Sequence, residues 1–447
     1  MGYSPHTPAD REMMLAAIGA ASVDELFADI PTAVRSTRFE VPPPLTEQEV
    51  RAELSRLAGR NQIPRISFLG GGVYRHLIPS VVGEVIGRAE FSTSYTPYQP
   101  EVSQGTLQSI YEFQSLICEL TGMEVASASH YDGATATAEA ALMACRLTHR
   151  DAIAVSSAVN PMVRRVLATY CSGPGIEVVE LAADLGESGS GLTPVSGAAD
   201  LLDERFACLV VQQPNFFGGI EPMGELAEAA HASGAQLVAV VEPTSLALLE
   251  APGAYGADIV AAEGQPLGIP VSYGGPYVGL MATRMASVRQ MPGRLAGGTR
   301  DAQGRIGYVL TLQAREQHIR REKAASNICT NQALCALAAT AYLTAVGPDG
   351  LREVAELSVT QARHLASALE GAGIGERRFS APYFAEVAIR LPGAARRHAA
   401  LAEQGIVAGY VVARDYPELP DTLLLATTEL TTDADIEALV EALQATR

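Results

Sequence analysis

Lysine is almost absent from this sequence of 447 residues. Lys323 is the only one, and every other member of the 32 lysines and arginines is an arginine. A lysine amine is the side chain that forms a Schiff base with a carbonyl compound. Lys323 is therefore the one candidate in this chain for forming a Schiff base, or there is no candidate at all.

Paired cysteines are also missing. No two cysteines form a Cys-x-x-Cys motif, so a zinc site is not expected, and small buried thiols are the simplest interpretation. The six cysteines are Cys118, Cys145, Cys171, Cys208, Cys329 and Cys335.

Positive charge and long apolar runs are scarce as well. The 50 acidic residues exceed the 32 basic ones and give a formal net charge of −18. Such a surface repels phosphate backbones, so no nucleic-acid partner is expected, and one helical face explains the basic run at 315–323. No window approaches the roughly 18–20 consecutive apolar residues of a membrane span. Met1–Asp10 shows no signal-peptide pattern, so we expect a cytoplasmic protein without a membrane partner.

The length and the 48% hydrophobic content predict two or three domains with a sizeable core. We divide the chain into an N-terminal helical arm (1–62), a large α/β domain (63–328) and a smaller C-terminal α+β domain (329–447). Within the arm, residues 8–18 form one helix candidate. Thr46 caps another, because Glu49 follows three residues later in a capping-box pattern.

Short apolar runs alternate with helical stretches through the large domain, a pattern typical of a parallel sheet covered on both faces. The predicted strands are 152–156, 176–181, 208–212, 237–241, 259–262 and 277–281. The predicted helices between them include 106–121, 134–148, 161–170 and 223–233. In the smaller domain we predict helices at 332–345, 349–370 and 433–445, and strands at 384–391, 406–412 and 423–427.

Two segments near the start of the large domain are too unusual in composition for ordinary packing. Gly70, Gly71 and Gly72 follow a strand-like run, and consecutive glycines form either an anion-binding nest or a flexible turn. Residues 94–105 combine two tyrosines and two prolines with many polar side chains. Proline stiffens such a segment, which then either positions a substrate at a cleft or forms a structural loop.

Two further segments carry groups that could bind an anion. Asp132, Gly133 and Thr135 stand at the start of an alanine-rich helix, whose free amides favour a phosphate; Asp132 could equally be a simple cap. Residues 265–276, 292–294 and 313–321 together make a polar, arginine-rich stretch, and arginine binds carboxylate or phosphate bidentately or lines a solvated helix face.

Together these motifs resemble the glycine cleavage system P-protein family. The matching stretches are residues 95–105, 131–135, 274–276, 291–294 and 313–328. The length and the three glycines resemble the α subunit (subunit 1) of the two-subunit form. The resemblance implies the fold of pyridoxal-phosphate (PLP) transferases of fold type I, which is aspartate-aminotransferase-like, with a three-layer large domain and a smaller C-terminal domain.

The resemblance also implies an activity, that of glycine dehydrogenase (aminomethyl-transferring). Such an enzyme decarboxylates glycine with PLP and passes the aminomethyl group to the lipoyl arm of H-protein. The family's cofactor is held by a lysine after a strand of the large domain, yet Glu263 and the residues after it include no lysine. Lys323 belongs to a different motif. We therefore expect a homologous β subunit to hold PLP covalently, in an α2β2 assembly.

The resemblance assigns roles to several residues. Tyr95, Tyr98, Gln99 and Ser103 would reach the partner's site, where they would position glycine or shape the pocket. Asp132, Gly133 and Thr135 would keep a vestigial phosphate cup. Glu242 could pair with a pyridine nitrogen, although Pro243 departs from the usual pattern.

Two other interpretations remain open. A self-sufficient PLP enzyme, such as an aminotransferase, would have to use Lys323. A structural or regulatory pseudoenzyme would use no cofactor at all.

Overall fold

The computed structural model describes residues 5–36 and 41–446, and the chain divides into two compact units, Met1–Gln62 and Ile63–Arg447. The first unit contains the helices α1 (Pro8–Ile18) and α2 (Glu47–Ala58) and the short 3₁₀ turns η1 (Val23–Phe27) and η2 (Thr32–Val34). Capping boxes start both α-helices, as Thr46 with Glu49 predicts. None of the residues in these four elements is buried.

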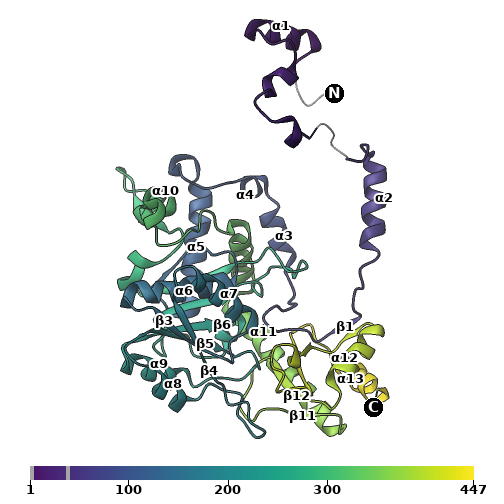
Figure 1. Cartoon of the computed structure of the whole chain (residues 1–447). Coiled ribbons are helices and arrows are strands. Elements are labelled where there is room, and N and C mark those ends of the chain that lie inside the picture. Colours follow the sequence, from purple (N-terminus) through teal and green to yellow (C-terminus); the bar gives the residue numbers. More distant parts are fainter. Residues whose placement is uncertain (1–4, 37–40, 447) are drawn as a thin grey trace. The chain divides into compact units, whose positions relative to one another are not determined.

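A seven-stranded sheet organises the larger part of the second unit (Figure 1), with the strand order β2-β8-β7-β6-β5-β3-β4. Its members are β2 (Val125–Ala126), β3 (Ala152–Ser156), β4 (Glu177–Leu181), β5 (Phe206–Gln213), β6 (Gln236–Val241), β7 (Ile259–Glu263) and β8 (Gly279–Thr283). Strands β3 to β7 are parallel, as predicted. Strand β8 is antiparallel to both β7 and β2.

The antiparallel direction of β8 corrects the prediction of a sixth parallel strand at 277–281. A parallel crossover needs a connection of a dozen or more residues that usually contains a helix. Residues 264–278 contain turns and irregular backbone but no helix, and the chain returns along the edge of β7 in the opposite direction. An apolar run marks a buried strand but does not reveal its direction.

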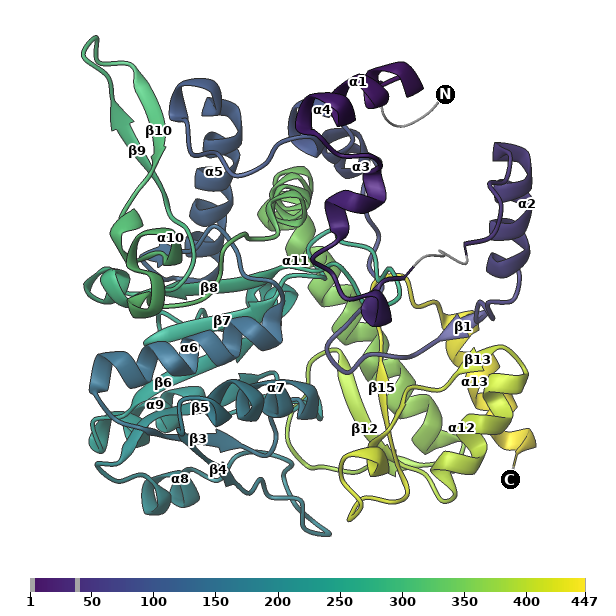
Figure 2. The ribbon, with the colours of Figure 1, turned by 45° about the horizontal axis from the view of Figure 1, so that its top comes forward.

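Helices cover both faces of this sheet (Figure 2). Alternate residues of β5 belong to different cores: Leu209 and Val211 to one, Cys208 and Val210 to the other. The first core adds side chains of α5 (Gln104–Thr121), α8 (Val195–Leu201), α9 (Met223–Ala232) and α11 (Ala333–Gly371). The second adds α6 (Gly133–Thr148) and α7 (Pro161–Ser172). The large domain therefore has the three layers that the sequence predicts.

A second, antiparallel sheet forms the C-terminal part, with the order β11-β12-β15-β14. Its strands are β11 (Glu376–Arg377), β12 (Glu386–Arg390), β14 (Tyr410–Val411) and β15 (Thr422–Ala426), and it packs with α12 (Ala394–Glu403) and α13 (Asp433–Ala445). The single strand predicted at 406–412 is wrong. Gly409 turns the chain there at φ +69°, so β13 (Ile406–Val407) pairs instead with β1 (Ile66–Ser67).

Helix α11 connects the two sheets. Its path breaks at Gly347, just before Pro348, in agreement with the two helices that the sequence predicts. By length and composition α11 is apolar enough to cross a membrane. Burial explains this composition, because Ala339 and Tyr342 pack in the core of the large sheet, and Leu365 packs in the core of the small one.

The remaining elements connect those described above. They are the helices α3 (Ser80–Ile86), α4 (Ala89–Ser92) and α10 (Gln317–Arg320), the 3₁₀ turns η3 (Pro100–Val102), η4 (Pro243–Ala247), η5 (Met285–Gln290), η6 (Gln313–Arg315), η7 (Arg321–Lys323) and η8 (Val412–Arg414), and the hairpin β9 (Ala296–Arg300) and β10 (Ile306–Leu310). The hairpin packs on α5, where the amide of Gln104 bonds to both the N–H and the carbonyl of Tyr308.

Gly218→Ala tests the contact between the loop after β5 and strand β12. A Cβ at Gly218 would lie 2.0 Å from the backbone oxygen of Glu386, so we expect a loss of about 3 kcal/mol or more in the free energy of unfolding. Gly304→Ala is the matched control, because its φ is also positive but nothing lies within 4 Å. Urea unfolding measures both variants, and equal losses would contradict the close contact.

Candidate functional sites

A cleft opens at the carboxyl ends of β5, β6 and β7. Its volume is about 300 Å³, and α/β proteins bind ligands at this edge of the sheet. The first turns of α6 and α7 and the glycine segment at 71–74 complete its walls. Three carboxylates line it, those of Asp132, Glu242 and Glu263, and among the described residues no lysine, arginine or histidine does.

The start of α6 forms one wall of this cleft. Asp132 caps the helix: its Oδ1 accepts hydrogen bonds from the N–H of Thr135 at 2.7 Å and from the Thr135 hydroxyl at 2.9 Å. The structure thus brings Asp132, Gly133 and Thr135 together and also realises the simple capping role. The N–H of Gly133 donates to Glu263 Oε2 at 2.8 Å. Two N–H groups of the predicted phosphate cup, those of Gly133 and Thr135, are thus bonded to carboxylates of the chain itself.

Glu263 stands at the end of β7 and begins the stretch 263–268, where the family's lysine is expected. Its Oε1 accepts a second hydrogen bond, from the N–H of Gln265 at 2.9 Å. Burial raises the pKa of this carboxyl to about 7, against the lowering effect of the Gly133 and Gln265 N–H groups. With a carboxylate at the helix start and no lysine after the strand, the cleft does not fit PLP.

The carboxylate of Glu242, at the end of β6, also accepts hydrogen bonds from groups of the chain itself. Its carboxylate accepts hydrogen bonds from the N–H of Thr244 at 3.1 Å, from the Thr244 hydroxyl at 2.7 Å and from the N–H of Ser245 at 2.7 Å. These bonds hold the turn η4, which Pro243 starts. Glu242 therefore stabilises its own turn, and its pairing with a pyridine nitrogen stays a prediction that no contact supports.

The glycine segment is fixed by another buried carboxylate. Glu386 accepts hydrogen bonds from the N–H of Gly71 and from the Tyr74 hydroxyl, both at 2.7 Å. Asn160 adds a bond from its side-chain amide to the carbonyl of Gly71 at 2.7 Å. The sequence leaves two interpretations open for the three glycines, an anion-binding nest and a flexible turn. The Gly71 N–H does bind a carboxylate, but that carboxylate is Glu386 of the chain's own strand β12.

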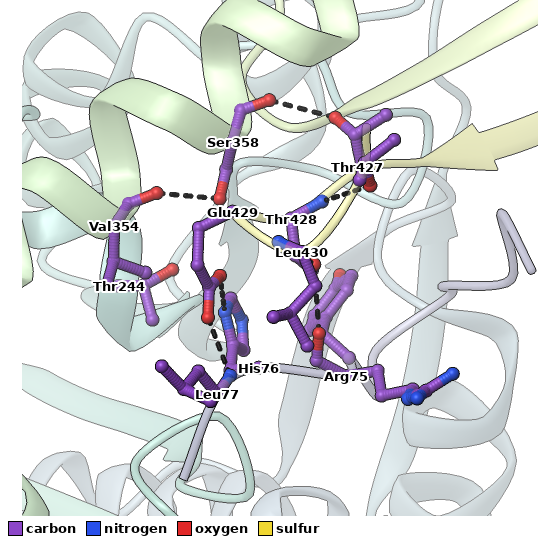
Figure 3. Close-up of polar contacts among 12 residues, drawn as sticks. Arg75, His76, Leu77, Thr244, Val354, Ser358, Thr427, Thr428, Glu429 and Leu430 are labelled. Atoms are coloured by element: carbon purple, nitrogen blue, oxygen red, sulfur yellow. Dashed lines mark hydrogen bonds and ion pairs between the residues drawn. The ribbon is translucent and has the colours of Figure 1, made fainter. Parts of the chain in front are cut away.

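The chain continues from this segment into a contact that sequence reasoning missed (Figure 3). His76 Nδ1 lies 2.7 Å from Glu429 Oε2, and both side chains are buried. The N–H of Leu77 donates to Glu429 Oε1 at 2.6 Å, and the Thr428 hydroxyl donates to the carbonyl of Arg75 at 2.9 Å. Residues 70–77, called the strap below, are thus bonded to the C-terminal sheet region along their length. No sequence signal indicates this pairing, because its partners are more than 350 positions apart.

The tyrosine segment lies elsewhere, before α5. Tyr95 is 79% exposed and Tyr98 is 46% exposed. Gln99 is exposed next to η3, and Ser103 is half-buried at the start of α5. The four predicted residues therefore share a segment, but only Tyr98 belongs to the side-chain cluster described next.

Tyr98 joins two of the arginine-rich motifs. The guanidinium carbon of Arg294 lies 5.6 Å from the centre of its ring, and the ring of His318 packs edge-on at 5.4 Å. Arg294 is 4% exposed and Glu316 is 7% exposed, with Arg294 Nε 3.8 Å from Glu316 Oε2. We call Tyr98, Arg294, Glu316 and His318 the tyrosine–arginine cluster.

This cluster is incompletely satisfied. Within the described part of the chain, Arg294 Nε and Glu316 Oε1 have no hydrogen-bond partner. Glu316 and His318 line a hollow of about 420 Å³ beside α10. Burial raises the pKa of Glu316, while the charges of Arg294 and His318 lower it. Buried polar atoms normally find partners, so these two atoms are exceptions within the described chain, and the exposed members of the cluster are Tyr98 and His318.

The single lysine belongs to neither region. Lys323 is exposed in η7 and does not line the cleft. Within residues 5–36 and 41–446, no group of three or more histidine, cysteine, aspartate or glutamate side chains is placed to hold a metal ion.

Comparison with known proteins decides the family. The model of the glycine cleavage system P-protein family matches residues 1–443. This chain belongs to that family. A relative from Moorella thermoacetica, named probable glycine dehydrogenase (decarboxylating) subunit 1, is 51% identical over 99% of both chains.

Solved structures agree with this assignment and with the fold. A glycine decarboxylase (P-protein) of the glycine cleavage system, crystallised in inhibitor-bound form, is 46% identical over 100% of both chains, with a TM-score of 0.90. A glutamate decarboxylase from Lactobacillus brevis is only 12% identical but covers 94% of this chain and 96% of its own, with a TM-score of 0.69, which concerns the fold alone. The predicted fold, that of PLP-dependent enzymes of fold type I, is confirmed.

Glu386→Gln should reduce the dependence of stability on pH. Burial raises the pKa of Glu386 from 4.5 to about 7, so the folded chain binds this proton more tightly than the unfolded chain. Its contribution to stability is complete below the unfolded value and is lost as the pH rises through about 7, a total of roughly 3 kcal/mol. Glutamine keeps an oxygen for the Gly71 N–H and removes this loss.

The measurement is the free energy of unfolding in urea across the window from the unfolded to the folded pKa. The wild-type chain should lose more stability over that window than Glu386→Gln. Glu376→Gln, at an exposed glutamate of β11, is the matched control and should follow the wild type. Parallel curves for Glu386→Gln and the wild type would contradict the assignment.

Proposed function

We propose that this chain is the first subunit of a two-subunit glycine decarboxylase of the glycine cleavage system. The observation that carries the proposal is the state of its own cleft, which has no lysine after β7 and a carboxylate at the start of α6. A homologous β subunit holds PLP on its own lysine. The names of the full-length relatives support a subunit role.

The partner's PLP supplies the electron sink for loss of carbon dioxide from glycine. The contribution of this chain is the tyrosine–arginine cluster and the stiff segment that leads to it. Tyr95 and Tyr98 expose their rings, and Arg294 places a cation beneath the ring of Tyr98. These groups, with Gln99 and Ser103, position glycine or shape the pocket at the seam between the two subunits.

Glu316 and His318 add a group of neighbouring charges to the same region. Glu316 has one carboxylate oxygen without a partner in the described chain and lies close to the cations of Arg294 and His318. A seam that closes over this cluster excludes water and strengthens each of these charge interactions. The groups of the cluster that the β subunit or glycine can then reach are the exposed Tyr98 and His318.

The assembly we propose is α2β2, in the cytoplasm, with a lipoylated H-protein as the acceptor of the aminomethyl group. The net charge of −18 favours encounter with a partner that presents a basic surface. A self-contained PLP enzyme would depend on Lys323, which is exposed and outside the cleft. A purely structural subunit would have no need of the dense hydroxyl and amide groups at residues 95–105.

Changing Tyr95 and Tyr98 together to phenylalanine in the assembled enzyme should lower kcat/KM for glycine by about tenfold or more, or roughly 1.4 kcal/mol. The reason is loss of the two hydroxyl groups from the seam with the rings retained. Tyr170→Phe, on α7 and outside both regions, is the matched control. Unchanged glycine turnover in the double variant would remove both tyrosines from the site.

Borohydride reduction of the PLP-loaded complex, followed by mass mapping, should place the pyridoxyl group on a lysine of the β subunit. The same treatment of this chain alone should leave it unlabelled, because Lys323 lies outside the cleft. A pyridoxyl group on Lys323 would replace the subunit proposal with a self-contained PLP enzyme.

A further inference from the structure

The contact between Glu263 and the start of α6 has a consequence for what this cleft can bind. A helix of 16 residues presents free N–H groups and the positive end of its dipole at the first turn. Phosphate groups bind at such a position. Here Glu263 Oε2 accepts the Gly133 N–H at 2.8 Å, and Asp132 Oδ1 accepts the Thr135 N–H at 2.7 Å.

The backbone geometry brings Glu263 to this place. A Cβ built on Gly133 would lie 2.6 Å from the backbone nitrogen of Glu263 and 2.7 Å from its Cα. Only glycine therefore allows the end of β7 to lie directly against the start of α6. The N–H of Gln265 fixes the other carboxylate oxygen at 2.9 Å, so the side chain is held from both sides.

The negative charges in the cleft also oppose the binding of a phosphate. Asp132, Glu242 and Glu263 line it, and no cationic side chain among the described residues does. An incoming phosphate would have to displace a carboxylate of the chain and then stay near two more. A tethered carboxylate also has a far higher local concentration than any free anion.

We infer that Glu263 is a built-in occupant of the anion seat at the start of α6, and that this chain's own cleft therefore rejects PLP and other phosphate monoesters even without covalent attachment. The seat is filled from within the chain, and Glu263 is the residue that decides its ligand specificity. Combined with the proposed function, on which this last step rests, the β subunit offers the one cofactor site of each α/β pair.

The test is phosphate binding by the full chain, without a partner, read at the Gly133 amide. Labelling with ¹³C-carbonyl aspartate and ¹⁵N-glycine selects Asp-Gly pairs, and the sequence contains two, Asp132-Gly133 and Asp349-Gly350. The second pair lies in α11 and is the internal reference. Inorganic phosphate, and then pyridoxine phosphate, which has no aldehyde and so forms no Schiff base, are the probes.

In the wild-type chain the Gly133 signal should not move with either probe. In Glu263→Ala it should shift on addition of phosphate, with an affinity at least about tenfold above that of the wild type. Glu242→Gln is the matched control, because it removes a charge from the same cleft without freeing the Gly133 N–H. Any gain in its affinity for phosphate should be smaller than that of Glu263→Ala.

A Gly133 shift in the wild type equal to that in Glu263→Ala would overturn the inference, as would a Glu263→Ala chain that binds phosphate no better than Glu242→Gln. If Glu263→Ala does not fold, Glu263→Val replaces it, since valine suits the end of a strand and, like alanine, leaves the Gly133 N–H without its acceptor. It should bind phosphate better than the wild type, and equal binding would contradict the inference. None of these outcomes depends on the β subunit, so failure here is distinct from failure of the proposed function.

Discussion

Hydrogen bonds from backbone N–H groups to buried glutamates fix the loops around the cleft, and the arrangement of this edge depends on them. Glu263 binds the start of α6, Glu386 binds the glycine segment, and Glu429 binds the end of the strap. Glu221, which does not line the cleft, likewise accepts a hydrogen bond from the N–H of Thr193, at 2.9 Å. A buried carboxylate is costly unless its oxygens accept such bonds, so each of these loops is specified by the acid that it satisfies.

This interaction also explains why the fold was far easier to predict than the cleft. The strands and helices follow from local periodicity, and the Asp132 cap follows from residues that are three positions apart. The bonds from Glu263 to Gly133 and from Glu386 to Gly71 join residues 130 and 315 positions apart. No local pattern contains that information. The missing lysine after β7 was visible, but the occupant of the helix start was not.

The tyrosine–arginine cluster shows a different limit of sequence reasoning. Residues 94–105 and the arginine-rich motifs were recognised separately, by their composition. Their meeting at Tyr98, Arg294 and His318 needed the tertiary structure. The two regions also differ in chemistry: the carboxylates of the cleft have partners within the chain, whereas Arg294 Nε and Glu316 Oε1 have none in its described part.

The strap has a consequence for the order of events during synthesis. Its residues near the start of the second unit bond to Glu386 and Glu429, and Ile66 of β1 pairs with Ile406 of β13. A nascent chain must therefore carry this segment without its partners until almost the whole sequence has left the ribosome. Contacts of such sequence separation form late and slow the overall rate of folding. The parallel core of β3 to β7 can assemble earlier, and the wall that the strap gives to the cleft is then among the last parts of the molecule to be completed.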